Sequence, residues 1–310
     1  MSSPAASARA ALLTELIDDA SLFPPATLPM RAALIAHRRD RESAYAALAG
    51  RFVVPASRST ELLAQREPDV PLRLSVILDG TATGDWEHGF SSDLRAVSDL
   101  RDAGLAVESL EVRLPPAEPI DSARLASALA LLPPGEAAPL AIWFELPYDG
   151  GWRCAPDEAL AALAEAGASI PHTVGAKVRC GGLELRAFPT VEELAAFVVS
   201  AHIAKVPWKA TAGLHHPFRG KHGAFMMHGF LNLFVAAIAL HAGLIASDRV
   251  AQIIGEHEAR AFSVDGAHVA WRDVRIPAEA VAAARNHATS YGSCSFSEPA
   301  IDLVRAGFLA

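Results

Sequence analysis

Apolar and polar positions alternate in short runs that recur about every thirty residues along the chain, the spacing of strand–helix units. Each run has the alternation of a β-strand, and a longer stretch with helical periodicity follows it. The runs lie at Asp19, Arg51, Leu72, Val107, Leu140, Val174 and His202. Strict alternation of strands and helices predicts an α/β fold with a parallel sheet covered by helices.

The stretches between the runs carry the start and stop signals of helices. Several open with Ser, Thr or Asp, whose side chains accept hydrogen bonds from backbone N–H groups at a helix start. Two end at Gly104 and Gly167, which suit helix C-termini. Seven units can be counted, and an eighth would close a (β/α)8 TIM barrel. An open doubly wound sheet is the alternative, but no GxGxxG turn follows the first run.

The eighth strand has two placements. We place it at Tyr291 to Phe296, after a hairpin insertion at residues 260–277 whose turn is Asp265-Gly266. The rival placement is Ala261 to Val264. The first predicts a single TIM-barrel domain over residues 1–310 with an extended C-terminal segment. The chain shows no linker or low-complexity block that indicates a second domain.

Composition narrows the class of protein. With 310 residues, 51% of them hydrophobic, the chain can bury a large core. A net charge of −8 argues against nucleic acid or an anionic membrane as a partner and favours a small anionic metabolite bound by a local positive field. Three cysteines without metal-ligand spacing predict reduced thiols and a cytoplasmic location. The sequence leaves a homo-oligomer open.

No targeting or membrane-spanning segment is expected. The N-terminus lacks the basic region and long apolar core of a signal peptide. The most apolar run, Phe230 to Ile245, contains Asn232 and His241 and is short for a bilayer span. We interpret it as a buried helix.

Inside the predicted barrel, strand side chains alternate between two faces, and the apolar set should face the helices. On the run at Val107, Leu110 and Val112 then face outward. The predicted inward-facing ionisable residues of four adjacent strands are Glu111, Arg113, Glu145, Lys177, Arg179 and Lys209. Barrel interiors are usually apolar, whereas active sites lie at the carboxyl ends of the strands. This charge therefore predicts a functional site at that end.

Residues that follow other strands join the same predicted site. The residues expected to bind the substrate are Arg58, Asp79, Glu111, Arg113, Arg179 and His216. Those expected to be catalytic are Lys177, Lys209, Glu145 and His215. The competing interpretation is a non-catalytic or structural barrel in which the charges neutralise one another, for example Glu111 with Arg113 and Glu145 with Lys177.

Lys177 is the predicted nucleophile. A lysine away from water and beside other cations has a lowered pKa, which leaves its amine free to attack a carbonyl group. Arg179 and Lys209 are the expected neighbouring cations, and Glu145 is placed to move protons.

A resemblance supports this chemistry. Lysines on the sixth and seventh strands, in GAKVRCGG and KATAGLHH, resemble the class I aldolases of the deoxyribose-phosphate aldolase type. The resemblance implies that Lys177 forms a Schiff base and that Lys209 perturbs it. The whole chain also resembles an uncharacterised group of bacterial and plant proteins that carry KATAGLHHP and GSCSF stretches.

The sequence therefore predicts an enzyme with aldolase or lyase chemistry on a small anionic or carbonyl metabolite, without a cofactor. The alternative is a metal-assisted lyase or hydrolase that uses His215, His216 and a strand-end carboxylate. No ligand spacing such as HExxH is present.

Overall fold

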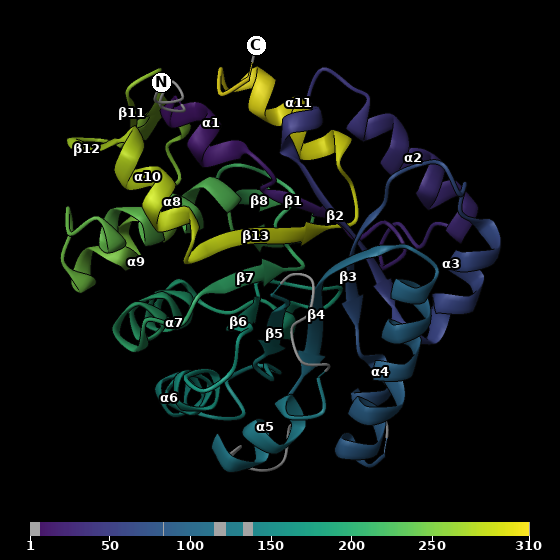
Figure 1. The fold of residues 1–310 in the computed structure, drawn as a ribbon. Helices are drawn as coiled ribbons and strands as arrows, with labels where there is room; N and C mark the ends of the chain where they lie inside the picture. Colours follow the sequence, from purple (N-terminus) through teal and green to yellow (C-terminus); the bar gives the residue numbers. More distant parts are fainter. Residues whose placement is uncertain (1–6, 83, 115–121, 133–138, 310) are drawn as a thin grey trace, which may run out of the picture.

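Eight parallel strands form a closed barrel at the centre of the protein (Figure 1). The structure is a computed structural model that describes residues 7–82, 84–114, 122–132 and 139–309. The strands, in their order around the barrel, are β1 (Ile17–Asp19), β2 (Ala49–Pro55), β3 (Arg73–Ile77), β4 (Ala106–Arg113), β5 (Ala141–Glu145), β6 (Thr173–Arg179), β7 (Trp208–Thr211) and β13 (Ala288–Ser293). The predicted (β/α)8 TIM barrel is confirmed.

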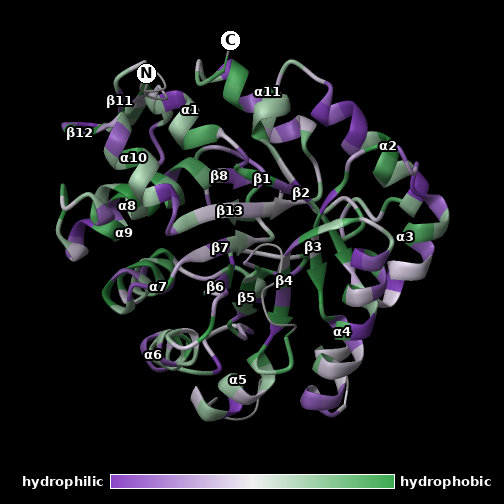
Figure 2. Cartoon of the chain, in the orientation of Figure 1, coloured by the Kyte–Doolittle hydropathy of each residue, from purple (hydrophilic) through white to green (hydrophobic). Residues whose placement is uncertain are grey.

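Helices surround the strands, and hydrophobic and hydrophilic residues alternate along outer helices such as α2 and α4 (Figure 2). The α-helices are α1 (Ala8–Leu13), α2 (Met30–Arg41), α3 (Ser59–Gln65), α4 (Trp86–Asp102), α5 (Ser122–Leu129), α6 (Pro156–Gly167), α7 (Val191–Ala204), α8 (Phe230–His241), α9 (Val250–Ile254), α10 (Ala278–Arg285) and α11 (Ser297–Arg305). Short 3-10 turns are η1 (Ala46–Leu48), η2 (Ala56–Arg58), η3 (Asp79–Ala82), η4 (Leu185–Ala187), η5 (Ser247–Arg249) and η6 (Ala259–Ala261).

The first and last strands of the barrel, β1 and β13, differ in position from the expected ones. β1 ends at Asp19, where the predicted first strand was to begin, so its residues are Ile17–Asp19. The closing strand β13 overlaps the favoured placement but begins at Ala288. The rival placement is wrong, because Phe262–Val264 forms β10 in a separate sheet.

The insertion before the closing strand is a three-stranded antiparallel sheet rather than a two-stranded hairpin. β10 pairs with β11 (His268–Trp271) across the expected turn at Asp265-Gly266. β11 then pairs with β12 (Val274–Pro277). A second small hairpin, β8 (Gly220–His222) with β9 (Phe225–Met227), lies in the connection after β7 and was not predicted.

A layer of apolar side chains joins the outer face of the barrel to the helices. Trp208 of β7, for example, packs its ring against Phe197 of α7 and Phe234 of α8. α8 is buried along its length up to His241, as expected for this run. Its Asn232 accepts a hydrogen bond from the N–H of Arg219 and donates to two backbone carbonyl groups. These bonds satisfy the buried amide.

One helical stretch among the described residues, Leu185–Ala204, has the length and mean hydropathy (1.2) of a membrane span, with 33% of it buried. It consists of η4 and α7, and α7 packs between α6 and α8 in the ring around the barrel (Figure 1). A capping box of Thr190 and Glu193 fixes the start of α7. This packing is that of an ordinary barrel helix.

Substitution of Gly175 by alanine should destabilise the barrel. A Cβ atom there would lie 2.3 Å from the Trp143 ring and 2.5 Å from the Pro207 carbonyl oxygen. Overpacking of this kind costs about 1–3 kcal/mol. Urea unfolding should show the loss, whereas Gly266→Ala, where no atom lies within 4 Å of the added methyl group, should leave the midpoint nearly unchanged. Equal midpoints for both variants would contradict the close packing at Gly175.

Candidate active site

A cavity of about 640 Å³ opens at the carboxyl ends of the barrel strands. The predicted site residues that line it are Asp79, Glu111, Arg113, Glu145, Lys177, Arg179 and His215. Lys209 is not in this lining; its side chain is only 1% exposed. Side chains alternate between the two faces of β4 to β7, which turns the predicted ionisable groups inward. Because the strands are parallel, their carboxyl ends bring these groups to one end of the barrel.

Two carboxylates hold the ammonium group of Lys177. Its Nζ lies 2.7 Å from Glu111 Oε2 and 2.8 Å from Glu145 Oε2. Glu145 also accepts hydrogen bonds from Arg179, at 3.2 and 3.3 Å. The register places Glu145 beside Lys177 on adjacent strands, which explains the pairing. The expected pair of Glu111 with Arg113 is not formed.

Glu111 bridges the two lysines. Its other carboxylate oxygen accepts hydrogen bonds from Lys209 Nζ at 2.6 Å and from the Ser75 hydroxyl at 2.7 Å. Both ammonium groups therefore contact one carboxylate. Their separation is smaller than about 10 Å, one Debye length, beyond which two charges would not act in one site. Lys177 and Lys209 belong to a single cluster.

Asp18 is the principal site residue that the sequence analysis missed. It is fully buried, and it accepts hydrogen bonds from Lys209 Nζ and the Ser290 hydroxyl, both at 2.7 Å. Gly50 makes room for this carboxylate, since a Cβ there would lie 2.4 Å from Asp18 Oδ1. The available signal was a carboxylate directly after the apolar pair Leu16-Ile17. It was overlooked because the first strand was placed two residues too late.

The charges continue through the barrel as an alternating ion chain, which we define by its ten members. They are Arg179, Glu145, Lys177, Glu111, Lys209, Asp18, Arg51, Glu108, Arg73 and Glu15. Arg179, at one end, contacts Glu145, and each of the other four cations contacts the carboxylates before and after it, so five positive charges balance five negative ones. Complete pairing of this kind limits the cost of burying the ions.

The ion chain sets the protonation states at the cavity. Burial opposes ionisation of Glu145, but Lys177 and Arg179 outweigh it and lower its pKa to about 2. Glu111 likewise has a lowered pKa, because the charges of Lys177 and Lys209 exceed the effect of burial. Burial favours a neutral Lys177, yet Glu111 and Glu145 raise its pKa above the ordinary value. The prediction of a lowered pKa at Lys177 is therefore wrong for this state of the protein.

Arg113 and Arg179 supply positive charge at the mouth of the cavity. Arg113 is exposed and makes no ion pair within the part of the chain that the structure describes. Its backbone carbonyl accepts a hydrogen bond from Trp86 Nε1, which fixes the end of β4. Arg179 is tied to Glu145, but its side chain is 36% exposed. This mouth can therefore attract an anionic group without breaking a buried ion pair.

The remaining lining residues are held by neighbours at the same end. Asp79 accepts hydrogen bonds from the backbone N–H and the hydroxyl of Ser57. His215 Nδ1 lies 3.1 Å from Glu298 Oε2 of α11. The turn after β7 passes close to the one after β6, because a Cβ at Gly213 would lie 2.6 Å from the Gly181 Cα. Gly213 also has φ +72°, which favours glycine.

Two predicted substrate-binding residues lie outside this cavity. Arg58 forms an ion pair with Glu61 at 2.7 Å on η2 and α3, so it does not line the cavity. His216 turns away, bonds Asp302 of α11 at 2.7 Å and stacks on His222. Both residues lie beyond strand ends, Arg58 in η2 and His216 in a loop, where the period of two no longer fixes the direction of a side chain.

The histidine pair does not converge on one point. His215 and His216 contact different carboxylates of α11, Glu298 and Asp302. Among the described residues, no group of three or more histidine, cysteine or acidic side chains is placed to hold a metal ion.

Comparisons with protein-family models, with curated proteins and with solved structures found no match to this chain. The chemistry of the site must therefore be argued from its own residues.

Replacement of Glu111 by glutamine should destabilise the protein strongly. The change leaves two buried ammonium groups short of a partner, and removal of one member of a buried ion pair costs about 3–5 kcal/mol. Glu42→Gln is the matched control, since Glu42 is exposed and, among the described residues, pairs with the exposed Arg38 alone. Chemical denaturation should separate the two variants clearly; similar midpoints would show that the ion chain does not depend on Glu111.

Stability should fall in acid as Glu145 is protonated. The pKa of this carboxyl is about 2 in the folded protein against an ordinary 4.5. Its contribution is therefore present above pH 4.5 and is lost as the pH falls toward 2. The free energy of unfolding, measured against pH, should fall less steeply in this window for Glu145→Gln. Identical slopes would mean that Glu145 is not held ionised by its neighbours.

Proposed function

We propose that the protein is an enzyme that acts on a small anionic carbonyl compound, with aldolase-like lyase chemistry through a Schiff base on Lys177. One observation carries the proposal. The amine of Lys177 borders a cavity of about 640 Å³ and lies in direct contact with two carboxylates that can take its proton. A lysine, a proton acceptor and an open space are the components that this chemistry needs.

The raised pKa of Lys177 changes the first step of the expected mechanism. The resting ammonium would pass a proton to Glu145 over 2.8 Å, and the freed amine would attack the carbonyl carbon of the substrate. The carbinolamine would then lose water to give an iminium ion. That ion accepts the electron pair of the bond between the α and β carbons of the substrate as this bond breaks, while the β-hydroxyl group loses its proton and leaves as a second carbonyl compound. Protonation of the resulting enamine and hydrolysis would return the free lysine.

The other residues have supporting roles in this proposal. Lys209 keeps one oxygen of Glu111 occupied, which directs the second oxygen to Lys177. Arg113 and Arg179 would hold the anionic part of the substrate at the mouth. His215, on the cavity wall and next to Glu298, would exchange protons with the leaving fragment. The proposal requires no cofactor and places the enzyme in the cytoplasm.

A second candidate is a non-catalytic barrel that binds a small anion. It is favoured by the complete pairing of both lysines, which matches a structural ion network. The open cavity favours the enzyme over a purely structural role, as does Arg113, which has no ion pair with the residues that the structure describes. Metal-assisted chemistry has less support, because His215 and His216 face different carboxylates.

Reductive trapping tests the Schiff base. The protein is incubated with glyoxylate, pyruvate or acetaldehyde, reduced with borohydride and digested for mass spectrometry. We expect an adduct on the peptide that contains Lys177. It should be absent from Lys177→Arg and retained in Lys221→Arg, a matched change at an exposed lysine. The raised pKa of Lys177 keeps its amine protonated through this range, so the small fraction of free amine grows with pH and trapping should accelerate from about pH 6 to about pH 9.

The other outcomes select the alternatives. Saturable binding of these anions without an adduct or turnover would indicate the non-catalytic barrel. Turnover without an adduct that a chelator abolishes would indicate metal-assisted chemistry. An adduct on Lys221 that persists in Lys177→Arg would contradict the assignment of Lys177.

A further inference from the structure

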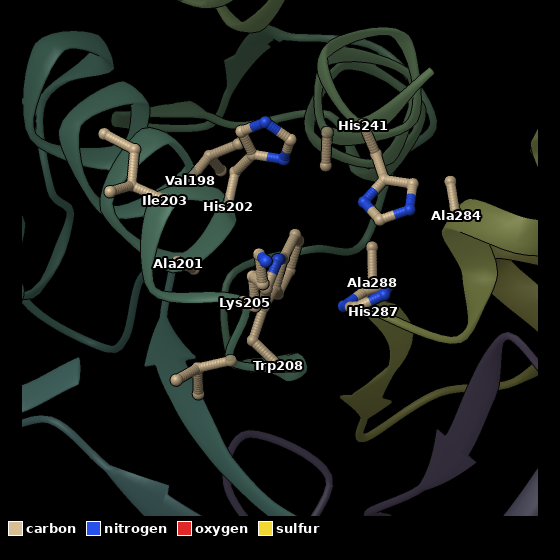
Figure 3. A pocket seen from close by; sticks show the side chains of 12 residues that line it. Val198, Ala201, His202, Ile203, Lys205, Trp208, His241, Ala284, His287 and Ala288 are labelled. Carbon is tan, nitrogen blue, oxygen red and sulfur yellow. The ribbon is translucent and has the colours of Figure 1, made fainter. Parts of the chain in front are cut away.

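A second cavity, of about 360 Å³, lies at the opposite end of the barrel strands from the candidate active site. Trp208 and Ala288, the first residues of β7 and β13, line it. Arg179 and Thr211, which line the other cavity, are the last residues of their strands. Figure 3 shows the second cavity between α7, α8 and the segment that leads into β13.

Three imidazole rings from three separate elements surround this space (Figure 3). His202 belongs to α7, His241 ends α8, and His287 lies between α10 and β13. The ring centroids of His241 and His287 are 4.3 Å apart, and those of His202 and His241 are 5.8 Å apart. Over the described ranges, none of the three side chains has a hydrogen bond or an ion pair. Their ring nitrogens are available to a ligand.

Lys205 adds a fixed positive charge. It caps the C-terminus of α7 in the left-handed conformation, with φ 55°, and it lines the cavity. No aspartate or glutamate is among the described lining residues. Lys205 makes no ion pair with the acidic residues that the structure describes. The cavity therefore has cationic and proton-accepting groups without a countercharge.

The remaining wall is apolar. Val206, Trp208 and Ala201 are buried, and Val198 and Ala237 complete the surface. A ligand that suits both parts has a charged head group near the imidazoles and a short apolar body against Trp208.

The rings of His241 and His287 are harder to protonate than a free imidazole. Burial, then the neighbouring His287 and His202, lower the pKa of His241. Burial and His202 lower the pKa of His287. An anion would reverse this effect, because it stabilises the charged form of each ring. The nearby Arg285 of α10 is not part of this balance, since its guanidinium bonds the carbonyl oxygens of Ala288 and Thr289.

We infer that this cavity binds a small organic anion, whose carboxylate or phosphate group is held by His241, His287 and Lys205. A metal ion is disfavoured, because the described histidines are not arranged as a metal-binding group and Lys205 would repel a cation. The site is distinct from the candidate active site, and the inference does not depend on the proposed function.

Sulfate and benzoate are suitable probes. Sulfate tests the head group, and benzoate adds an apolar body. Histidine ring signals of the full-length labelled protein are followed by NMR during each titration. We expect saturable shifts at His202, His241 and His287, and none at the exposed His257, which is absent from the cavity. Sulfate affinity should rise about tenfold per pH unit, as the pH falls, for each proton taken up.

Two variants and one control locate the binding. His287→Asn removes one ring, and Lys205→Asn removes the ammonium while its asparagine tolerates the left-handed conformation. Each should weaken sulfate binding at least roughly tenfold, the loss of one charged hydrogen bond. His257→Asn should leave it unchanged. An Arg113→Gln background lowers the positive charge at the mouth of the candidate active site, where Arg179 remains, and should leave the sulfate response of His241 and His287 unchanged.

Two results would overturn the inference. One is sulfate and benzoate binding that is unchanged in both His287→Asn and Lys205→Asn. The other is an absence of any response to the anions combined with tight binding of Zn²⁺ that His287→Asn abolishes, which would make the cluster a metal site instead.

Discussion

The carboxylate of Glu111, shared between two lysines, is the interaction on which the candidate site depends. One oxygen holds Lys177 and the other holds Lys209, and the Glu111 side chain is only 3% exposed. A buried ammonium ion costs several kcal/mol unless a carboxylate compensates it. The barrel register supplies that compensation from β4 to β6 and β7, so the charges can be placed only when these strands have paired correctly. Fold and site are therefore specified together.

The sequence could predict the barrel and much of its charged interior because β4 to β7 show clear alternation over several residues. Glu111, Glu145, Lys177 and Lys209 all face inward as the period of two requires. β1 has only three residues, too few for the pattern to show which side chains face inward. Asp18 was therefore not predicted as a site residue. Arg58 and His216 lie beyond strand ends, where tertiary contacts with Glu61 and Asp302 decide their direction.

The protonation state of Lys177 depends on charges that are distant in the sequence. Along the chain its nearest charge is Arg179, and one of its two strand neighbours is Lys209, which suggested a repelled and neutral amine. Its real partners come from β4 and β5, and their negative charges reverse the sign of the pKa shift. The consequence is chemical. A nucleophilic role for Lys177 has to begin with a proton transfer inside the ion chain rather than with a preformed free amine.

Consecutive residues of β7 contact the second cavity and the ion chain. Trp208 faces outward, packs on Phe197 and Phe234 and lines the second cavity. Lys209, the next residue, faces inward and bonds Asp18 and Glu111. Because side chains alternate along a strand, one face of this short segment lines the second cavity and the other contacts the ion chain. A displacement of the β7 backbone at Trp208 would therefore be transmitted directly to the lysine that holds Glu111 in place.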